Sequence, residues 1–212
     1  AMPLTVPAPS ALTDDFAANT FLIDNAMHVP LCEDAVKRPF QIGDKQAALY
    51  FIDGMIDNER IAHYVLSPCQ QARFEAVTAE NLMQTLLPVG SIAHTQQLSQ
   101  VLQRIYSGDA AILCEGVSGA VICDIKGYAK RSVTKPQNEN VVEGPQEGFT
   151  ETLRDNIVLL RRIMRTPQLI SRAVMLGKCI ETRASVLYLD GVAEEKTVED
   201  KIKDKIAEVW GE

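Results

Sequence analysis

The chain has 212 residues and a net charge of -7, with 46% apolar and 23% charged residues. These proportions are ordinary for a folded protein, and the acidic balance argues against general nucleic-acid binding. No apolar run approaches the roughly 18 residues of a membrane-spanning helix, and no basic segment followed by an apolar one indicates a secretory signal. The length suits one large domain or two small ones.

The chain contains five cysteines, an odd number, and no two of them are spaced as C-x-x-C. That pattern predicts neither a zinc site nor a disulfide framework. Two of them fall inside apolar runs typical of strands, where a free cysteine packs as a small apolar side chain. We interpret the cysteines as reduced packing residues in a reducing compartment rather than as redox groups. They are Cys32, Cys69, Cys114, Cys123 and Cys179.

The first part of the chain predicts a helix, a buried strand and a second helix. After a proline-rich tail, the apolar residues of 12–27 follow a helical spacing. Residues 46–53 form a continuous apolar run bounded by polar residues, which is typical of a buried strand. Gly54 permits a turn, Asp57 is a suitable N-cap for the next helix, and Pro68 is expected to end that helix.

The middle of the chain predicts two more helices and a hairpin. Residues 79–87 are predicted as a short helix, and the following helix is expected to be capped by Thr95 and to end at Gly108. Two apolar runs, at 110–114 and 120–125, are separated by a glycine-containing turn, and this pattern indicates a β-hairpin.

The apolar pattern stops between Gly127 and Gly144, so the expected domain boundary lies there. We predict an N-terminal α/β subdomain over residues 1–128, a linker over 129–143 and a C-terminal α/β subdomain over 144–212.

The predicted C-terminal subdomain begins with a helix that Thr150 or Thr152 opens and that runs through Met164. Two β-type runs follow, at 170–176 and 185–190, and a charged helix closes the chain. The predicted fold class is therefore α/β, with two small mixed α/β subdomains that are each a short sheet with flanking helices.

Two short segments resemble each other, one in each predicted subdomain. Residues 49–54 read LYFIDG and residues 186–191 read VLYLDG. Asp-Gly suits a tight turn with positive φ, so the match indicates either a structural repeat or shared turn chemistry. Asp53 and Asp190 could form a carboxylate pair, but their places at strand ends before glycine favour turn formation.

No motif for catalysis or cofactor binding is found in the sequence. The chain has no G-x-G-x-x-G, no G-x-x-x-x-G-K-[ST] and no G-x-S-x-G. The histidines His28, His63 and His94 fall in different predicted elements, without the spacing of a metal site. We therefore predict no catalytic residue, no metal and no cofactor.

The densest combination of polar and small residues lies at 144–156, which reads GPQEGFTETLRDN. Two glycines and a proline form a tight loop before a helix N-terminus, whose free N–H groups attract negative charge. Glu147 and Glu151 are placed to satisfy those groups.

Four arginines follow along the same predicted helix. Arg161 and Arg165 follow Arg154 by seven and eleven residues, about two and three helical turns, and Arg162 is adjacent to Arg161. We expect this cationic stripe on the side opposite the apolar stripe. It is interpreted either as a solvated helix face or as a docking surface for an acidic partner or anionic lipid head groups.

Several stretches of the chain carry a resemblance to a known family. They are ALYFIDGMID at 48–57, the segment 127–137 ending in KPQ, GPQEGFTETLRDNIVLLRR at 144–162, and the segment 176–191. Together they closely resemble the N-terminal region of GerA-type A subunits of spore germination proteins. The resemblance runs with gaps from roughly residue 46 to residue 206, and its G-P-x-E-G-F-T-E-T-L-R-x-N-I block is specific.

The sequence departs from the family pattern in two places. Gln146 stands where the family usually has arginine, and Arg161-Arg162-Ile163 stands where it often has three basic residues. These departures leave open whether the chain belongs to a full germinant receptor. The stage V sporulation protein AF type resembles residues 43–48 equally well, so both types remain open.

The resemblance implies a soluble head of two α/β subdomains that precedes a bundle of transmembrane helices lying outside these 212 residues. It implies a place at the inner membrane of bacterial spores, with this domain on the cytoplasmic side, in the spore core. The implied partners are other germination receptor subunits and copies of the same protein, with contact to the membrane surface, and no nucleic acid.

The leading hypothesis is a non-enzymatic domain that acts in complex assembly and in transmission of the germinant signal to ion release. The alternative is a small-molecule binding module with a ligand site between the two subdomains, near Asp53 and Asp190. An enzyme acting on a phosphorylated substrate is the third and weakest hypothesis. The residues predicted to form the interface or coupling surface are Gly144, Pro145, Glu147, Gly148, Phe149, Glu151, Arg154, Asn156, Arg161 and Arg162.

Overall fold

The larger of two sheets is built around a strand that the sequence predicts, β2 (Lys45–Ile52). In the computed structural model β2 pairs with β1 (Ala35–Ile42) on one side and with β4 (Ala110–Cys114) on the other. β5 (Ala120–Cys123) and β3 (Ile92–Thr95) complete an antiparallel sheet in the order β1-β2-β4-β5-β3. β4 and β5 form the predicted hairpin. The structure describes residues 11–74, 76–86, 89–127, 149–176, 181–193, 197–198, 200–202 and 204.

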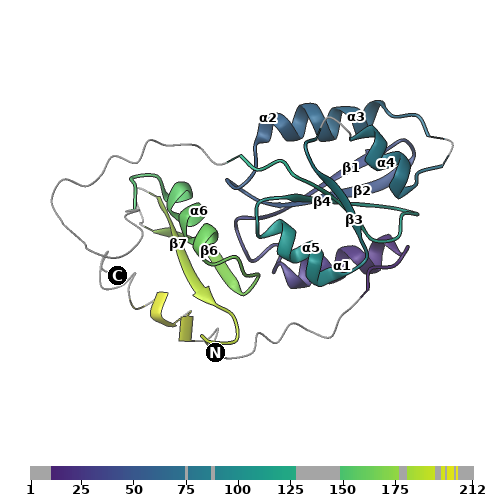
Figure 1. Cartoon of the computed structure of the whole chain (residues 1–212). Coiled ribbons are helices and arrows are strands. Elements are labelled where there is room, and N and C mark those ends of the chain that lie inside the picture. The colour runs from purple at the N-terminus through teal and green to yellow at the C-terminus, as the bar shows by residue number, and fades with distance from the viewer. Residues whose placement is uncertain are drawn as a thin grey trace.

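Both faces of this sheet are covered by helices, which explains why β2 is apolar without alternation. Tyr50 and Ile52 point to the face covered by α1 (Phe16–Ala26) and α5 (Leu98–Ile105). Leu49 and Phe51 point to the opposite face. That face is covered by α2 (Asn58–Arg60), the π-helical turn η1 (Ile61–Leu66), α3 (Ser67–Gln71) and α4 (Ala79–Thr85). Figure 1 shows the two helix layers above and below the strands.

The helical segment that follows β2 begins as predicted but continues further. The carboxylate of Asp57 accepts hydrogen bonds from the backbone N–H groups of Glu59 and Arg60, at 3.0 Å each, so the predicted N-cap is confirmed. The predicted end at Pro68 is wrong, because α3 continues to Gln71. Proline is tolerated in the first turn of a helix, and α3 starts anew after the π-helical turn, which places Pro68 there.

α5 begins two residues later than a Thr95 cap would place it. Thr95 is the last residue of β3, and its hydroxyl accepts a hydrogen bond from the N–H of Gln97 at 3.2 Å. Gln97 is the N-cap residue of α5 and makes no side-chain capping bond. Gly108, with a φ of 93°, follows the end of α5, where the sequence predicts the end.

The C-terminal part of the chain combines α6 (Leu153–Ile163) with a second, two-stranded antiparallel sheet. Its strands are β6 (Leu169–Leu176) and β7 (Thr182–Leu189). Thr197 and Val198 are helical, in agreement with the predicted last helix, and Val198 is buried. The two sheets with their helices confirm the mixed α/β fold class. The predicted linker lies outside the described residues, and none of the helices that the structure describes is long and apolar enough to span a membrane.

Candidate functional site

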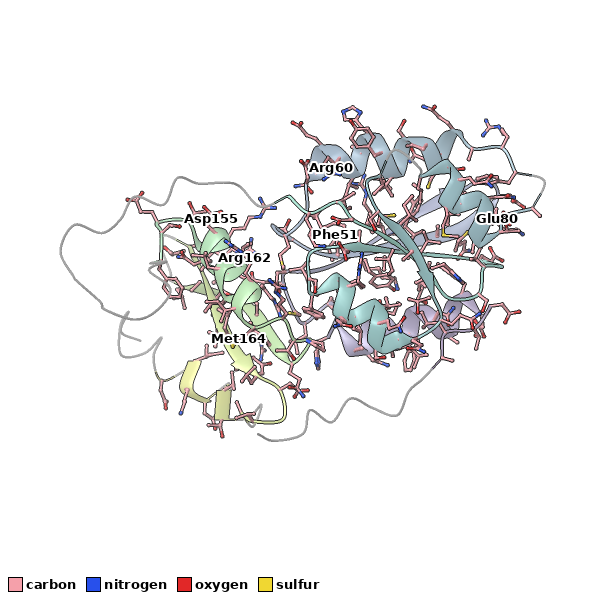
Figure 2. All side chains as sticks on the ribbon, in the orientation of Figure 1. Phe51, Arg60, Glu80, Asp155, Arg162 and Met164 are labelled. Atoms are coloured by element: carbon pink, nitrogen blue, oxygen red, sulfur yellow. The ribbon has the colours of Figure 1, made fainter. Side chains whose placement is uncertain are left out.

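Helix α6 lies against the end of β2, where the chain turns at Gly54. Gly54 has a φ of 79°, and a Cβ added there would lie 2.5 Å from Cγ2 of Val158 on α6. Val158 also packs against the core between the larger sheet, α1 and α5, together with Ile170 and Tyr188 of the smaller sheet. The contact therefore requires a glycine on the β2 side. In Figure 2, α6 can be found beside the larger sheet by the labels of Asp155 and Arg162 on the helix and of Met164 directly after it.

Arg154 joins α6 to the residue before that glycine. Its Nε donates to Oδ2 of Asp53 at 2.8 Å and its Nη2 to Oδ1 at 2.6 Å, a bidentate ion pair. The two side chains are 52% and 39% exposed. The hydrogen bonds to Asp53 raise the pKa of Arg154 above its ordinary value. The sequence predicts Arg154 for the coupling surface and Asp53 for a cleft, and in the structure the two residues are partners of each other.

Arg161 makes a second bidentate pair, two turns further along α6 and fully buried. Its Nε donates to Oδ2 of Asp34 at 2.7 Å and its Nη2 to Oδ1 at 2.8 Å. The side chains of Arg161 and Asp34 are 0% and 6% exposed. Burial alone would lower the pKa of Arg161, but hydrogen bonds to Asp34 and the charge of Asp34 raise this pKa overall, so the guanidinium stays charged.

Two further contacts fix the buried guanidinium of Arg161. It lies 5.3 Å from the centre of the Tyr106 ring, which the end of α5 supplies, within the range of a cation–π contact. Its Nη1 donates to the backbone oxygen of Thr166 at 3.3 Å. Thr166 lies between α6 and β6, so Arg161 connects the core of the larger sheet to the turn that leads into the smaller one.

Cys32 completes this buried group. Nη2 of Arg161 lies 3.1 Å from its sulfur, and the N–H of Ser171 donates to the same sulfur at 3.4 Å. The thiol donates to Oδ1 of Asp34 at 3.2 Å. Burial, and next the charge of Asp34, raise the pKa of Cys32 above 9.0, so it stays protonated at neutral pH. Cys32 thus both donates a hydrogen bond, to Asp34, and accepts hydrogen bonds, from Arg161 and Ser171.

Glu33, which lies between Cys32 and Asp34 in the sequence, contacts both strands of the smaller sheet. Its N–H donates to the backbone oxygen of Ser171 at 2.7 Å. Its carboxylate accepts hydrogen bonds from Ser171 at 2.9 Å, from Arg183 at 2.7 Å and from Ser185. Burial alone would raise the pKa of Glu33, but the hydrogen bonds from Ser185, Arg183 and Ser171 outweigh it and hold this pKa below 4.5.

We name the side chains of Cys32, Glu33, Asp34, Asp53, Arg154 and Arg161 the inter-sheet contact. Asp53, Arg154 and Arg161 are among the site residues predicted from the sequence, whereas Glu33 and Asp34 are not. The signal for them was weak: two acidic residues follow a proline, immediately before a strand that was not predicted. Their partners lie more than a hundred residues further along the chain.

The predicted position of the arginine stripe is wrong for Arg161. It follows Ile157 by one helical turn, and both residues are buried on the same side of α6. Arg162 and Arg165 are exposed. The helix thus presents one arginine to the protein interior, where Asp34 compensates its charge, and others to its outer side.

Other predicted surface residues have local roles or lie outside the described part. Phe149 is 72% exposed, and Glu151 is exposed. The amide of Asn156 bonds both the N–H and the carbonyl oxygen of Thr150, at 2.6 and 2.8 Å, and so fixes the entry to α6. The residues Gly144, Pro145, Glu147 and Gly148 lie outside the described residues.

Asp53 and Asp190 have different partners. Asp53 pairs with Arg154, whereas Asp190 is 54% exposed and lies 3.6 Å from Nε2 of His28. Gly191, like Gly54, has a positive φ, of 75°, so both Asp-Gly pairs form turns at strand ends. Two surface hollows of about 440 and 470 Å³ both lie around β1, and neither is lined by either aspartate. In the described residues no three side chains of metal-binding type converge.

Comparison with known proteins gives curated relatives in Bacillus subtilis. Spore germination protein B1 is 32% identical over 176 residues, which is 81% of this chain and 36% of the relative. Spore germination protein KA is 25% identical over 95% of this chain and 37% of the relative. Stage V sporulation protein AF is 26% identical over 86% of this chain and 38% of the relative. The chain therefore spans only a little over a third of the length of these relatives.

A solved structure shares the fold. The N-terminal domain of the A subunit of the Bacillus megaterium spore germinant receptor GerK3 superposes with a TM-score of 0.73 at 23% identity, over 93% of this chain and 73% of that one. The family model described as Bacillus/Clostridium GerA spore germination protein matches residues 22–210. With that match covering most of its length, the chain belongs to the GerA family of spore germination proteins.

Proposed function

We propose that the chain is a non-enzymatic head domain of a germination receptor subunit, acting in complex assembly and in transmission of the germinant signal to ion release. Family membership supports the receptor role. The observation that supports transmission is the buried pair of Arg161 and Asp34, which ties α6 and the smaller sheet to the core of the larger one.

The physical reason lies in how a buried ion pair responds to movement. Separating Arg161 from Asp34 without letting water in leaves two uncompensated charges, and this costs several kcal/mol per ion. Small displacements of α6 are therefore resisted, and a larger one opens the contact as a whole. A force applied to either part is passed to the other through the inter-sheet contact.

The whole protein's setting belongs to the same proposal. The full-length protein would sit in the spore inner membrane, with this domain on the side of the spore core. Its partners would be other receptor subunits and further copies of itself. The relatives named spore germination proteins and the structural likeness to a receptor A subunit support this setting.

Substitutions in the full-length protein in spores test the proposal. Arg154→Ala and Glu151→Ala are expected to slow germination or to lower the amount of assembled complex. Arg165→Ala is the matched control, because its side chain is exposed and the hydrogen bond that it makes among the described residues is to the backbone oxygen of Arg162, at 3.2 Å. Normal germination and assembly with Arg154→Ala and Glu151→Ala would show that this surface carries no signal.

A further inference from the structure

A surface hollow at the far end of β1 lies away from the inter-sheet contact. In the β1–β2 pair, Ala35 faces Ile52 at the end near α6, and Ile42 faces Lys45 at the other end. The hollow of about 440 Å³ opens at this second end, between β1 and the end of α3. The polar residues that line it are Arg38, Gln41, Gln70 and Arg73.

Two arginines line this hollow. Arg38 lies between Val36 and Phe40 in the row of β1 residues that packs toward α3 and α4. Arg73 follows the end of α3, and its guanidinium donates to the neighbouring carbonyl oxygen of Ala72, at 3.3 Å. In the described part of the chain neither forms an ion pair, although the protein as a whole carries a charge of -7.

We propose that this hollow binds a small soluble molecule that carries a carboxylate or phosphate group. Two guanidinium groups offer paired N–H donors that match such a group, and Gln70 adds an amide at the end of α3. Phe40 and Leu66 form the apolar wall against which the rest of the molecule would pack. The volume falls within the range of about 300–1,000 Å³ that small-molecule sites occupy.

The same chemistry would hold a phosphate of a free solute or of a lipid head group. We assign the free solute, because the apolar residues Phe40 and Leu66 line the hollow itself, where the rest of a small molecule would pack. The experiment therefore includes both sources.

Calorimetric titration of the 212-residue protein with citrate and with inorganic phosphate, at fixed ionic strength, tests the proposal. We expect saturable binding that the double variant Arg38→Gln/Arg73→Gln weakens by at least about tenfold, since charge-assisted hydrogen bonds are lost. Arg165→Gln removes an exposed arginine elsewhere and is expected to bind like the parent. Arg73→Lys keeps the charge but not the paired donors, and is expected to bind with intermediate affinity.

The outcomes separate the site from general charge effects. Absence of binding by the parent, equal weakening by Arg165→Gln, or full retention by Arg38→Gln/Arg73→Gln would each overturn the proposal. Co-sedimentation with phosphatidylglycerol vesicles is the second arm. Vesicle binding that depends on both arginines, with no binding of either free anion, would also overturn it, because the ligand would then be a lipid.

Discussion

Arg161 and Asp34 are separated by 127 residues in the sequence, yet their side chains meet in a bidentate pair that is closed to solvent. One residue comes from α6 and the other from the segment directly before β1. Cys32 and the Tyr106 ring enclose the guanidinium. The predictions below follow from this pair and from the contacts around it.

Removing one partner of the buried pair is expected to destabilise the protein strongly. Arg161→Met leaves the Asp34 carboxylate buried without a counter-charge, so we expect a loss of roughly 3–5 kcal/mol in the free energy of unfolding. Asp34→Asn combined with Arg161→Met is expected to cost less than the sum of the single changes. Urea unfolding of the four proteins measures this coupling, and additive losses would contradict it. Arg165→Met, on the exposed side, should stay within about 0.5 kcal/mol of the parent.

The close approach of Gly54 to α6 predicts a difference between two chemically identical substitutions. Gly54→Ala and Gly191→Ala both place a side chain at a positive φ, which costs roughly 1–2 kcal/mol. Only the Cβ at position 54 also meets Val158, whereas the space at position 191 is open. We therefore expect Gly54→Ala to lower the melting temperature more than Gly191→Ala. Equal melting temperatures would mean that α6 does not pack against this turn.

The hydrogen bonds to Glu33 predict a component of stability that is lost in acid. The pKa of Glu33 is lower in the folded protein than the ordinary 4.5, so the unfolded chain takes up its proton first as the pH falls. This component is fully present above about pH 4.5 and disappears as the pH falls through the folded-state value. In Glu33→Gln it is absent, so the melting temperature of this variant should depend less on pH below 4.5. Parallel curves for parent and variant between pH 3 and 6 would refute this role.

The cysteine environments predict slow labelling of the native protein. Burial raises the pKa of Cys32 above 9.0, and raises the pKa of Cys114 to about 11 and those of Cys69 and Cys123 to about 12. A Cys179→Ser variant removes the fifth cysteine, which lies outside the described residues. At pH 7 its four thiols should react with a maleimide much faster in urea than in buffer.

The thiol of Cys32 also reports on the inter-sheet contact. Arg161→Met, made in the Cys179→Ser background, should accelerate labelling of Cys32 while leaving Cys69 slow, because only Cys32 touches the guanidinium. Mass spectrometry of the labelled peptides distinguishes the two sites. Equal labelling rates of Cys32 with and without Arg161 would show that α6 stays in place without the pair.

The sequence predicts best those elements in which the burial of the strand or helix itself determines the pattern of apolar residues. The run that became β2 is buried on both faces, so its length and apolar character alone identify it. The two edge strands were not predicted. β1 contains Pro39 and two charged residues, which are acceptable at a sheet edge where one side of the strand is unpaired, and β3 has only four residues.

The candidate site was harder to predict because its partners are distant in sequence. The spacing of Arg154 along a helix says that it lies on one face, but not that Asp53 lies beside it. For Arg161 the charge itself suggested an outer face, and only the fold shows the compensating Asp34. A buried charge of this kind cannot be predicted without knowing where its counter-charge lies.

A charge exchange between Asp53 and Arg154 in the full-length protein tests transmission through the inter-sheet contact most directly. This pair is half-exposed, so either change should cost little stability. We predict that Asp53→Arg and Arg154→Asp each slow spore germination by at least about fivefold, the lower end of ordinary coupling between sites, at unchanged protein levels. The exchanged double variant should recover much of the parental rate. Parental germination with either single change, or a double variant as slow as the singles, would contradict the account.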